Sequence, residues 1–145
     1  MQGKVLPSAE DNLRGCISAM RTSLVNALQS AIGTPDTTGA CLYGCILVRL
    51  AITQWAKPYT PAVRGGGPLE GPELGLFDGT SWRGHYWVEV QLDGQPMYVA
   101  DISADQFGLE PLVLMPWAQA QQVYRPGEQQ AVDEALAEEL ARIGG

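Results

Sequence analysis

The sequence predicts an α+β fold in which helices cover a small antiparallel sheet, and three observations predict it. Apolar residues recur at helical spacing in two segments before residue 56. Residues 85–102 then read as two strands joined at Asp93-Gly94, a pair typical of a hairpin turn. A last helical pattern lies near the end of the chain. Helices before and after a hairpin favour this class over a purely helical or purely β fold.

The first helix is expected from about Ser8 to Ile32. Ser8 can accept a capping hydrogen bond, and Glu10 and Asp11 suit the positive end of a helix. The apolar residues at helical spacing are Leu13, Ile17, Met20, Leu24 and Leu28. Residues 33–35, Gly-Thr-Pro, are expected to end this helix.

A second helix is expected from roughly Cys41 to Trp55, after a polar loop at 36–39. It is apolar nearly all round, with Leu42, Tyr43, Ile46, Leu47, Val48, Leu50, Ala51 and Ile52. A helix of this kind is usually buried at the centre of the fold. The sequence therefore predicts that Cys41 stands in the first turn of a central helix.

A Gly/Pro-rich stretch at about 57–82 follows, and its composition predicts a loop without a regular element. A loop of this length just before His85 is typical of a functional loop or flap, although a surface excursion without a role is an equal alternative. The stretch is too short for a second domain, so residues 1–145 are expected to form one domain.

The hairpin register decides whether His85 and Asp101 can meet. A two-residue turn at Asp93-Gly94 would point Asp101 to the face opposite His85. A longer or bulged turn places Asp101 opposite Trp87 and diagonal to His85, within side-chain reach. This register also gathers the apolar side chains on one face, namely Tyr86, Val88, Val90, Leu92, Tyr98, Ala100 and Ile102. The longer or bulged turn is therefore the prediction.

Two elements are expected after the hairpin. Residues 112–115 can add a short strand, and Glu128 to Ile143 read as a third helix with a stripe of Val132, Leu136, Leu140 and Ile143. The terminal Gly144-Gly145 is interpreted as a helix end and tail.

Composition limits the classes of partner. The formal net charge of −7 disfavours nucleic acid and anionic membranes. The sequence shows neither a secretory signal nor a run long enough to span a bilayer, which indicates a protein of the cytoplasm. Its three cysteines are an odd number, so at least one free thiol is expected, in keeping with a reducing compartment.

Candidate catalytic residues follow from their order in the chain. His85 is the only histidine, and Cys41 precedes it while Asp101 follows it. A thiol at a helix N-terminus is favoured as thiolate, a histidine can serve as its base, and an aspartate can orient the imidazole. Gly39 before Cys41 leaves room for a substrate carbonyl to approach.

Each residue also has a structural explanation. Cys41 and Cys45 can be buried thiols, His85 a packed histidine, and Asp101 a strand cap. A metal site formed by Cys41, Cys45, His85 and an acid is a further alternative, but two cysteines four apart on one helix match zinc spacings poorly. Cys45 and Cys16 are interpreted as packing residues.

Three motifs together resemble a known family. They are Gly39-x-Cys41, His85-x-Trp87-Val88-Glu89, and the segment from Val99 through Asp101-Ile102-Ser103-x-Asp105-Gln106-Phe107. This set resembles the bacterial transglutaminase-like branch of the papain-like cysteine-enzyme superfamily, over roughly residues 38–108.

The resemblance implies a papain-like fold in which a central helix presents Cys41 to an antiparallel sheet carrying His85 and Asp101. It implies a Cys41 nucleophile, a His85 base and an Asp101 orienting group, which would act as a protease, amidase, deamidase or transglutaminase through a thioester. Gly39, Trp87 and Gln106 are expected to support the substrate or its oxyanion. A glutamine a few residues before the nucleophile, as papain-like enzymes have, is missing here, and the source of the second oxyanion donor is open.

The expected substrate is a protein or peptide, and neither a cofactor nor a metal is expected. A non-catalytic binding or regulatory module that retains this fold is the alternative from another functional class.

Overall fold

The computed structural model describes residues 8–34, 36–37 and 39–144. Segment 1–7, Pro35, Thr38 and Gly145, on which parts of the sequence interpretation rested, lie outside the described residues. The helices are α1 (Ala9–Ile32), α2 (Cys41–Trp55), α3 (Trp117–Ala120) and α4 (Gln129–Gly144), with a short 3₁₀ helix at Ala104–Phe107. The strands are β1 (Thr60–Gly66), β2 (Gly75–Phe77), β3 (Trp82–Arg83), β4 (His85–Leu92), β5 (Gln95–Asp101), β6 (Val113–Pro116) and β7 (Tyr124–Arg125). An α+β fold with a small antiparallel sheet is confirmed.

Both predicted N-terminal helices are present. The Ser8 side chain accepts a hydrogen bond from the Asp11 backbone N–H at 3.0 Å, and Gly33 closes α1 with a positive φ of 76°. Helix α2 is less buried than predicted, since Leu50 and Trp55 are 47% and 55% exposed. The apolar circumference of α2 therefore faces neighbours on part of its surface only.

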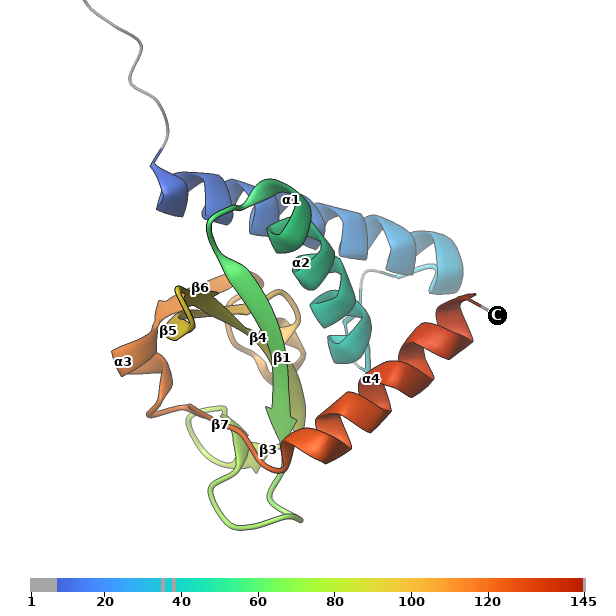
Figure 1. The fold of residues 1–145 in the computed structure, drawn as a ribbon. Helices are drawn as coiled ribbons and strands as arrows, with labels where there is room; N and C mark the ends of the chain where they lie inside the picture. Colours follow the sequence, from blue (N-terminus) through green and yellow to red (C-terminus); the bar gives the residue numbers. More distant parts are fainter. Residues whose placement is uncertain (1–7, 35, 38, 145) are drawn as a thin grey trace, which may run out of the picture.

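A four-stranded antiparallel sheet forms the centre of the fold, in the order β1-β4-β5-β6. Figure 1 shows α1, α2 and α4 on one side of this sheet and α3 with β7 on the other. A second sheet, in the order β3-β2-β7, lies at the end of the fold near the start of α4.

The prediction that residues 57–82 lack regular structure was wrong, because β1, β2 and β3 all begin in this stretch. Pro61 is compatible with β1 because β1 is an edge strand. Gly65 is needed within the strand, since a Cβ there would collide with the ring of Tyr86 on β4. The glycines that suggested a loop thus serve close strand packing.

The hairpin register combines the two alternatives considered from the sequence. The turn itself has two residues, since Leu92 pairs with Gln95. A bulge between Val90 and Gln91 then shifts the pairing, so that Val88 lies opposite Ala100. The three-residue turn was therefore wrong, but the predicted bulged register near Asp101 is confirmed.

Both faces of the central sheet are buried. The face toward α1, α2 and α4 carries Val88, Val90, Ala100 and Ile102, packed against helix residues such as Leu13, Ile17, Leu24, Val48 and Ile52. The opposite face carries Trp87 and Val99, packed with Leu76, Ala104, Ala120 and Tyr124. This double burial places the strand ends, where His85 and Asp101 lie, between two apolar clusters.

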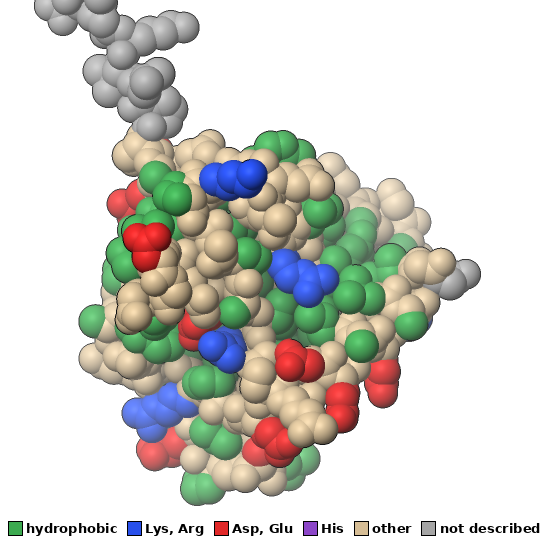
Figure 2. Space-filling model, viewed as in Figure 1, with side chains coloured by type: hydrophobic (Ala, Val, Ile, Leu, Met, Phe, Trp, Pro, Cys, Tyr) green, Lys and Arg blue, Asp and Glu red, His purple; other side chains and the backbone are tan. Residues whose placement is uncertain are grey.

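The C-terminal helix α4 buries only the first half of its predicted stripe. Val132 and Leu136 are buried, whereas Leu140 and Ile143 are 40% and 48% exposed. On the face of the molecule seen in Figure 2, apolar side chains lie between separated acidic and basic ones.

Within the described residues, each helix is too short or too polar to cross a membrane.

Candidate active site

His85 opens β4 and is held in a defined orientation. Only 2% of the residue is exposed, and its Nε2 lies 2.8 Å from Oδ2 of Asp101, the last residue of β5. The bulge in the hairpin produces this contact, because it brings the end of β5 to the same face as the start of β4. The predicted pairing of these two residues is therefore present in the structure.

Asp101 is buried and fully hydrogen-bonded. Its Oδ1 accepts from the Ser103 backbone N–H at 3.0 Å and from Ser103 Oγ at 3.4 Å. Its Oδ2 accepts from the Tyr124 hydroxyl at 2.8 Å as well as from His85. Burial alone would raise the pKa of this carboxyl, but the His85 charge and these hydrogen bonds hold it below the usual value.

Cys41 is the first residue of α2 and is partly exposed. Cys41 lies near enough to His85 to influence the pKa of the imidazole, and since Nε2 is bound to Asp101, the ring nitrogen left for Cys41 is Nδ1. Burial lowers the pKa of His85, but the charge and hydrogen bond of Asp101 and the neighbouring Cys41 together raise it to about 10. The charge of Asp101 and the neighbouring Cys41 therefore favour the protonated form of the imidazole.

The other cysteines lie in less reactive surroundings. Cys45 is 5% exposed, and burial followed by the charge of Asp101 raises the pKa of its thiol well above the ordinary value. Burial also raises the pKa of Cys16 on α1. All three cysteines are free, and Cys41 is the one that lies near His85 at the start of a helix.

Gln106 links the segments that carry Cys41 and Asp101. Its Oε1 accepts from the Gly39 backbone N–H at 3.4 Å, and its Nε2 donates to the Ser103 carbonyl at 3.0 Å. Because one backbone partner is an N–H donor and the other a carbonyl acceptor, they determine which end of the Gln106 amide is the oxygen and which is the nitrogen. Its Nε2 also lies 3.5 Å from His85 Nδ1, so this amide N–H group faces the nitrogen assigned to Cys41.

An ion pair that sequence reasoning missed fixes the loop before Cys41. The guanidinium of Arg21 on α1 binds both carboxylate oxygens of Asp105 at 2.9 Å and also donates to the Ile102 carbonyl at 2.7 Å. The Thr37 hydroxyl donates to the same carboxylate at 2.7 Å. Asp105 thereby holds the Cys41 loop, the Asp101 segment and α1 together.

The aromatic surroundings of His85 are packing groups. Trp87 is only 1% exposed and packs edge-on against Tyr124 with ring centroids 5.2 Å apart, so support from it to the substrate or its oxyanion would act through packing and not through direct contact. Phe107 meets the His85 ring edge-on at 5.3 Å. Tyr124 was missed from the sequence, where its isolated position in a short irregular segment gives no signal.

The metal alternative has no geometric support within the part of the chain that the structure describes. No group of three or more His, Cys, Asp or Glu side chains there is arranged to hold a metal ion. The arrangement instead places the Cys41 thiol near an imidazole that is hydrogen-bonded to a buried carboxylate.

Comparison with known proteins adds no relative. No protein-family model, curated protein or solved structure matches the chain.

Proposed function

We propose that the protein is a cysteine-dependent amide hydrolase or acyltransferase acting on a protein or peptide. The observation that carries this proposal is the buried His85–Asp101 pair, with Cys41 at the start of α2 near the imidazole. A helix that presents a cysteine to an antiparallel sheet carrying histidine and aspartate fits the papain-like, transglutaminase-like arrangement indicated by the motifs. Membership of that superfamily is part of the proposal.

In the first half of the reaction, the Cys41 thiolate attacks the carbonyl carbon of an amide. The C–S bond forms, and the carbonyl electron pair moves to oxygen. When the tetrahedral intermediate collapses, the C–N bond breaks and the His85 imidazolium gives its proton to the leaving amine. The product of this half is a thioester on Cys41.

In the second half, His85 takes a proton from water, whose oxygen attacks the thioester. The C–O bond forms, the C–S bond breaks and the thiolate is restored beside the imidazolium. An amine in place of water gives a new amide by the same steps, so hydrolysis and transfer share one site. We propose hydrolysis ahead of transfer. The three free thiols suit a reducing cytoplasm, which is the proposed location.

The labelling rate of Cys41 with iodoacetamide tests the activated thiol. We expect labelling at about pH 6 at least 10-fold faster than that of an ordinary thiol, whose thiolate forms near pH 8.5. In His85→Ala the rate at this pH should fall, because the imidazolium that stabilises the thiolate is lost. Mass spectrometry locates the modified residue, with Cys45 and Cys16 as internal references. Slow labelling that is indifferent to His85 would favour a non-catalytic binding module.

Gln106 is expected to donate to the oxyanion, filling the position left by the missing upstream glutamine. Gln106→Met should slow acylation of Cys41 by an activated ester by about 10²- to 10³-fold, the usual effect of losing one such donor. Alkylation by iodoacetamide should change little, because it forms no oxyanion. Gln106→Glu keeps an acceptor oxygen for the Gly39 N–H but removes the amide N–H donor. Gln122→Met is the control at an exposed glutamine. Equal losses in both reactions would assign Gln106 to positioning Cys41 instead.

A further inference from the structure

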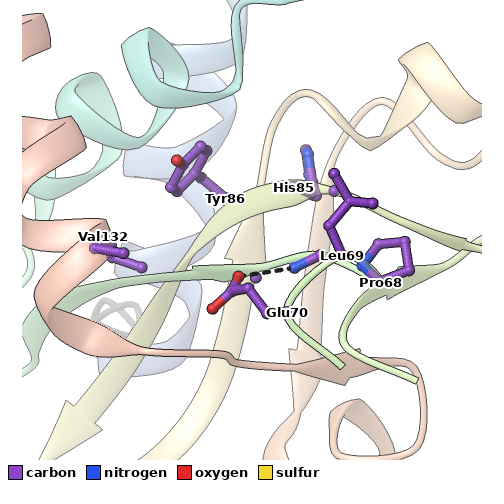
Figure 3. A pocket seen from close by; sticks show the side chains of 10 residues that line it. Pro68, Leu69, Glu70, His85, Tyr86 and Val132 are labelled. Atoms are coloured by element: carbon purple, nitrogen blue, oxygen red, sulfur yellow. Dashed lines mark hydrogen bonds between the residues drawn. The ribbon is translucent and has the colours of Figure 1, made fainter. Parts of the chain in front are cut away.

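A pocket of about 390 Å³ opens beside His85. Three segments line it, namely the end of β1 with the loop after it, the start of β4 and the start of α4. Figure 3 shows Tyr86 and Val132 on one side of the pocket, and Pro68, Leu69 and His85 on the other. This pocket is distinct from the hydrogen-bonded groups of the candidate triad, except that His85 belongs to both.

The lining of the pocket is mainly apolar. Val132 is 3% exposed, Tyr86 is half-buried, and Leu69 at the edge is fully exposed. An exposed leucine beside a concave apolar surface is suited to contact an apolar ligand. Arginine and lysine are absent from the described lining, so no such side chain is there to pair with an acidic ligand. The lining includes the Glu70 carboxylate, whose oxygens already accept hydrogen bonds from two backbone N–H groups.

The Glu70 carboxylate holds the walls of the pocket together. Its Oε1 accepts from the Gly67 backbone N–H at 3.2 Å, and its Oε2 accepts from the Glu128 backbone N–H at 2.9 Å. The Gly127 backbone N–H also donates to the Gly65 carbonyl at 2.9 Å. The loop and the start of α4 are therefore tied to each other, and the pocket is formed before a ligand arrives.

The pocket borders one residue of the candidate triad. His85 and its neighbour Tyr86 both line it, although the imidazole of His85 is itself fully buried. Tyr86 also lies near Cys41, whose charge, after burial, raises the pKa of the phenol. A group that occupies the pocket can therefore be part of the molecule whose carbonyl reaches Cys41.

Small residues keep this space open. A Cβ added to Gly84 would meet no atom within 4 Å, and the backbone there is outside the left-handed region. Ala131 is exposed in the first turn of α4 and also lines the pocket. Since a Cβ at Gly84 would meet no neighbour and Ala131 is exposed, larger side chains can be introduced at both positions to fill the pocket.

We infer that this pocket selects an uncharged apolar group, an aliphatic or aromatic side chain, on the acyl donor that forms the thioester with Cys41. The inference rests on the proposed function for the identity of the reaction. It adds the substrate class, which is an acyl donor with an apolar group next to the reacting carbonyl.

Acylation by p-nitrophenyl esters tests the selection. The Cys41 thiolate attacks the ester carbonyl, the C–S bond forms, and the C–O bond breaks with release of p-nitrophenolate. We expect hexanoyl transfer to exceed acetyl transfer by about 10- to 100-fold in kcat/KM, the range for filling an apolar site with a few methylenes. Gly84→Leu and Ala131→Phe should bring the ratio of hexanoyl to acetyl transfer down to about 1, whereas Ala141→Phe, on the exposed end of α4, should keep the wild-type ratio. Equal rates for the two esters, or a preference that survives both filled variants, would overturn the inference.

A binding measurement separates this inference from the proposed function. In Cys41→Ala, titration with hexanamide should shift the backbone amide NMR signals of Gly67, Gly84 and Val132, and Gly84→Leu in the same background should abolish the shifts. Saturable shifts without any acylation of the wild-type protein would retain the pocket and overturn the proposed function. Absence of these shifts in Cys41→Ala would overturn the pocket, whatever the ester kinetics show.

Discussion

Replacing Cys41 by alanine is expected to abolish acyl transfer, with a loss of about 10⁴-fold or more in kcat/KM, because the nucleophile of a catalytic unit cannot be replaced by its neighbours. Cys41→Ser should be nearly as inactive, since a hydroxyl does not ionise beside the His85 imidazolium as a thiol does. Turnover of an activated ester and the mass of the acylated protein provide the measurement. Folding should be affected by less than about 1 kcal/mol, because Cys41 is only partly buried.

Cys45→Ala is the matched control for this prediction. The two cysteines are one helical turn apart on α2, but only Cys41 lies at the helix start. Cys45 is buried against the core, where loss of its sulfur should cost stability of about 1 kcal/mol and leave the rate of ester turnover unchanged. If Cys45→Ala removed activity and Cys41→Ala preserved it, the assignment of the nucleophile would be wrong.

The sequence predicted the local part of this fold well. The helix α1 has a polar cap, acids in its first turn and a regular apolar stripe, and the observed helix agrees with all three. The register near Asp101 was also predictable, because only one register removes the acid from the apolar face of the hairpin. In both cases the determining residues are neighbours in the chain or partners across one turn.

Contacts between distant segments were not predictable. Gly65 reads as a loop signal until the ring of Tyr86 is seen to lie over it, 21 positions along the sequence, as part of β1 pairing with β4. Arg21 and Asp105 are separated by 84 residues, and no spacing rule links them. Short strands of two or three residues also carry too few side chains to show an alternating pattern.

For the candidate site, the order of residues in the chain pointed to the three candidate side chains, but it did not reveal the residues that support them. Cys41, His85 and Asp101 were proposed from chain order, and the structure pairs His85 with Asp101 and places Cys41 near the imidazole. The hydroxyl of Tyr124 on Asp101 depends on the path of β7, which the sequence did not reveal. Strand alternation places Trp87 on the His85 face, but the sequence did not show that residues of α3 and β7 cover that face.

The largest effect on both stability and activity outside the nucleophile is expected at Asp101. Asp101→Asn should lower kcat/KM by about 10²- to 10⁴-fold, because an amide no longer holds the imidazole in the orientation and charge state that the thiolate needs. Asp101→Ala should also destabilise the fold by about 3–5 kcal/mol, the usual result of leaving one partner of a buried pair uncompensated. Asp93→Asn in the exposed hairpin turn is the matched control. Ester turnover and urea unfolding measure the two effects.

The pH dependence of this stability difference distinguishes a buried ion pair from simple packing. The pKa of Asp101 is lowered in the fold, so its contribution is present above the ordinary aspartate value near 4 and is lost as the pH falls through the folded value. The pKa of His85 is raised to about 10, so its contribution is complete below the ordinary histidine value and is lost as the pH rises through about 10. The free energy of unfolding lost in Asp101→Asn should therefore be greatest between about pH 4 and 6.5 and should shrink toward either limit. A difference independent of pH would show that Asp101 and His85 are held together as neutral packing groups, and it would remove the electrostatic basis for an activated Cys41.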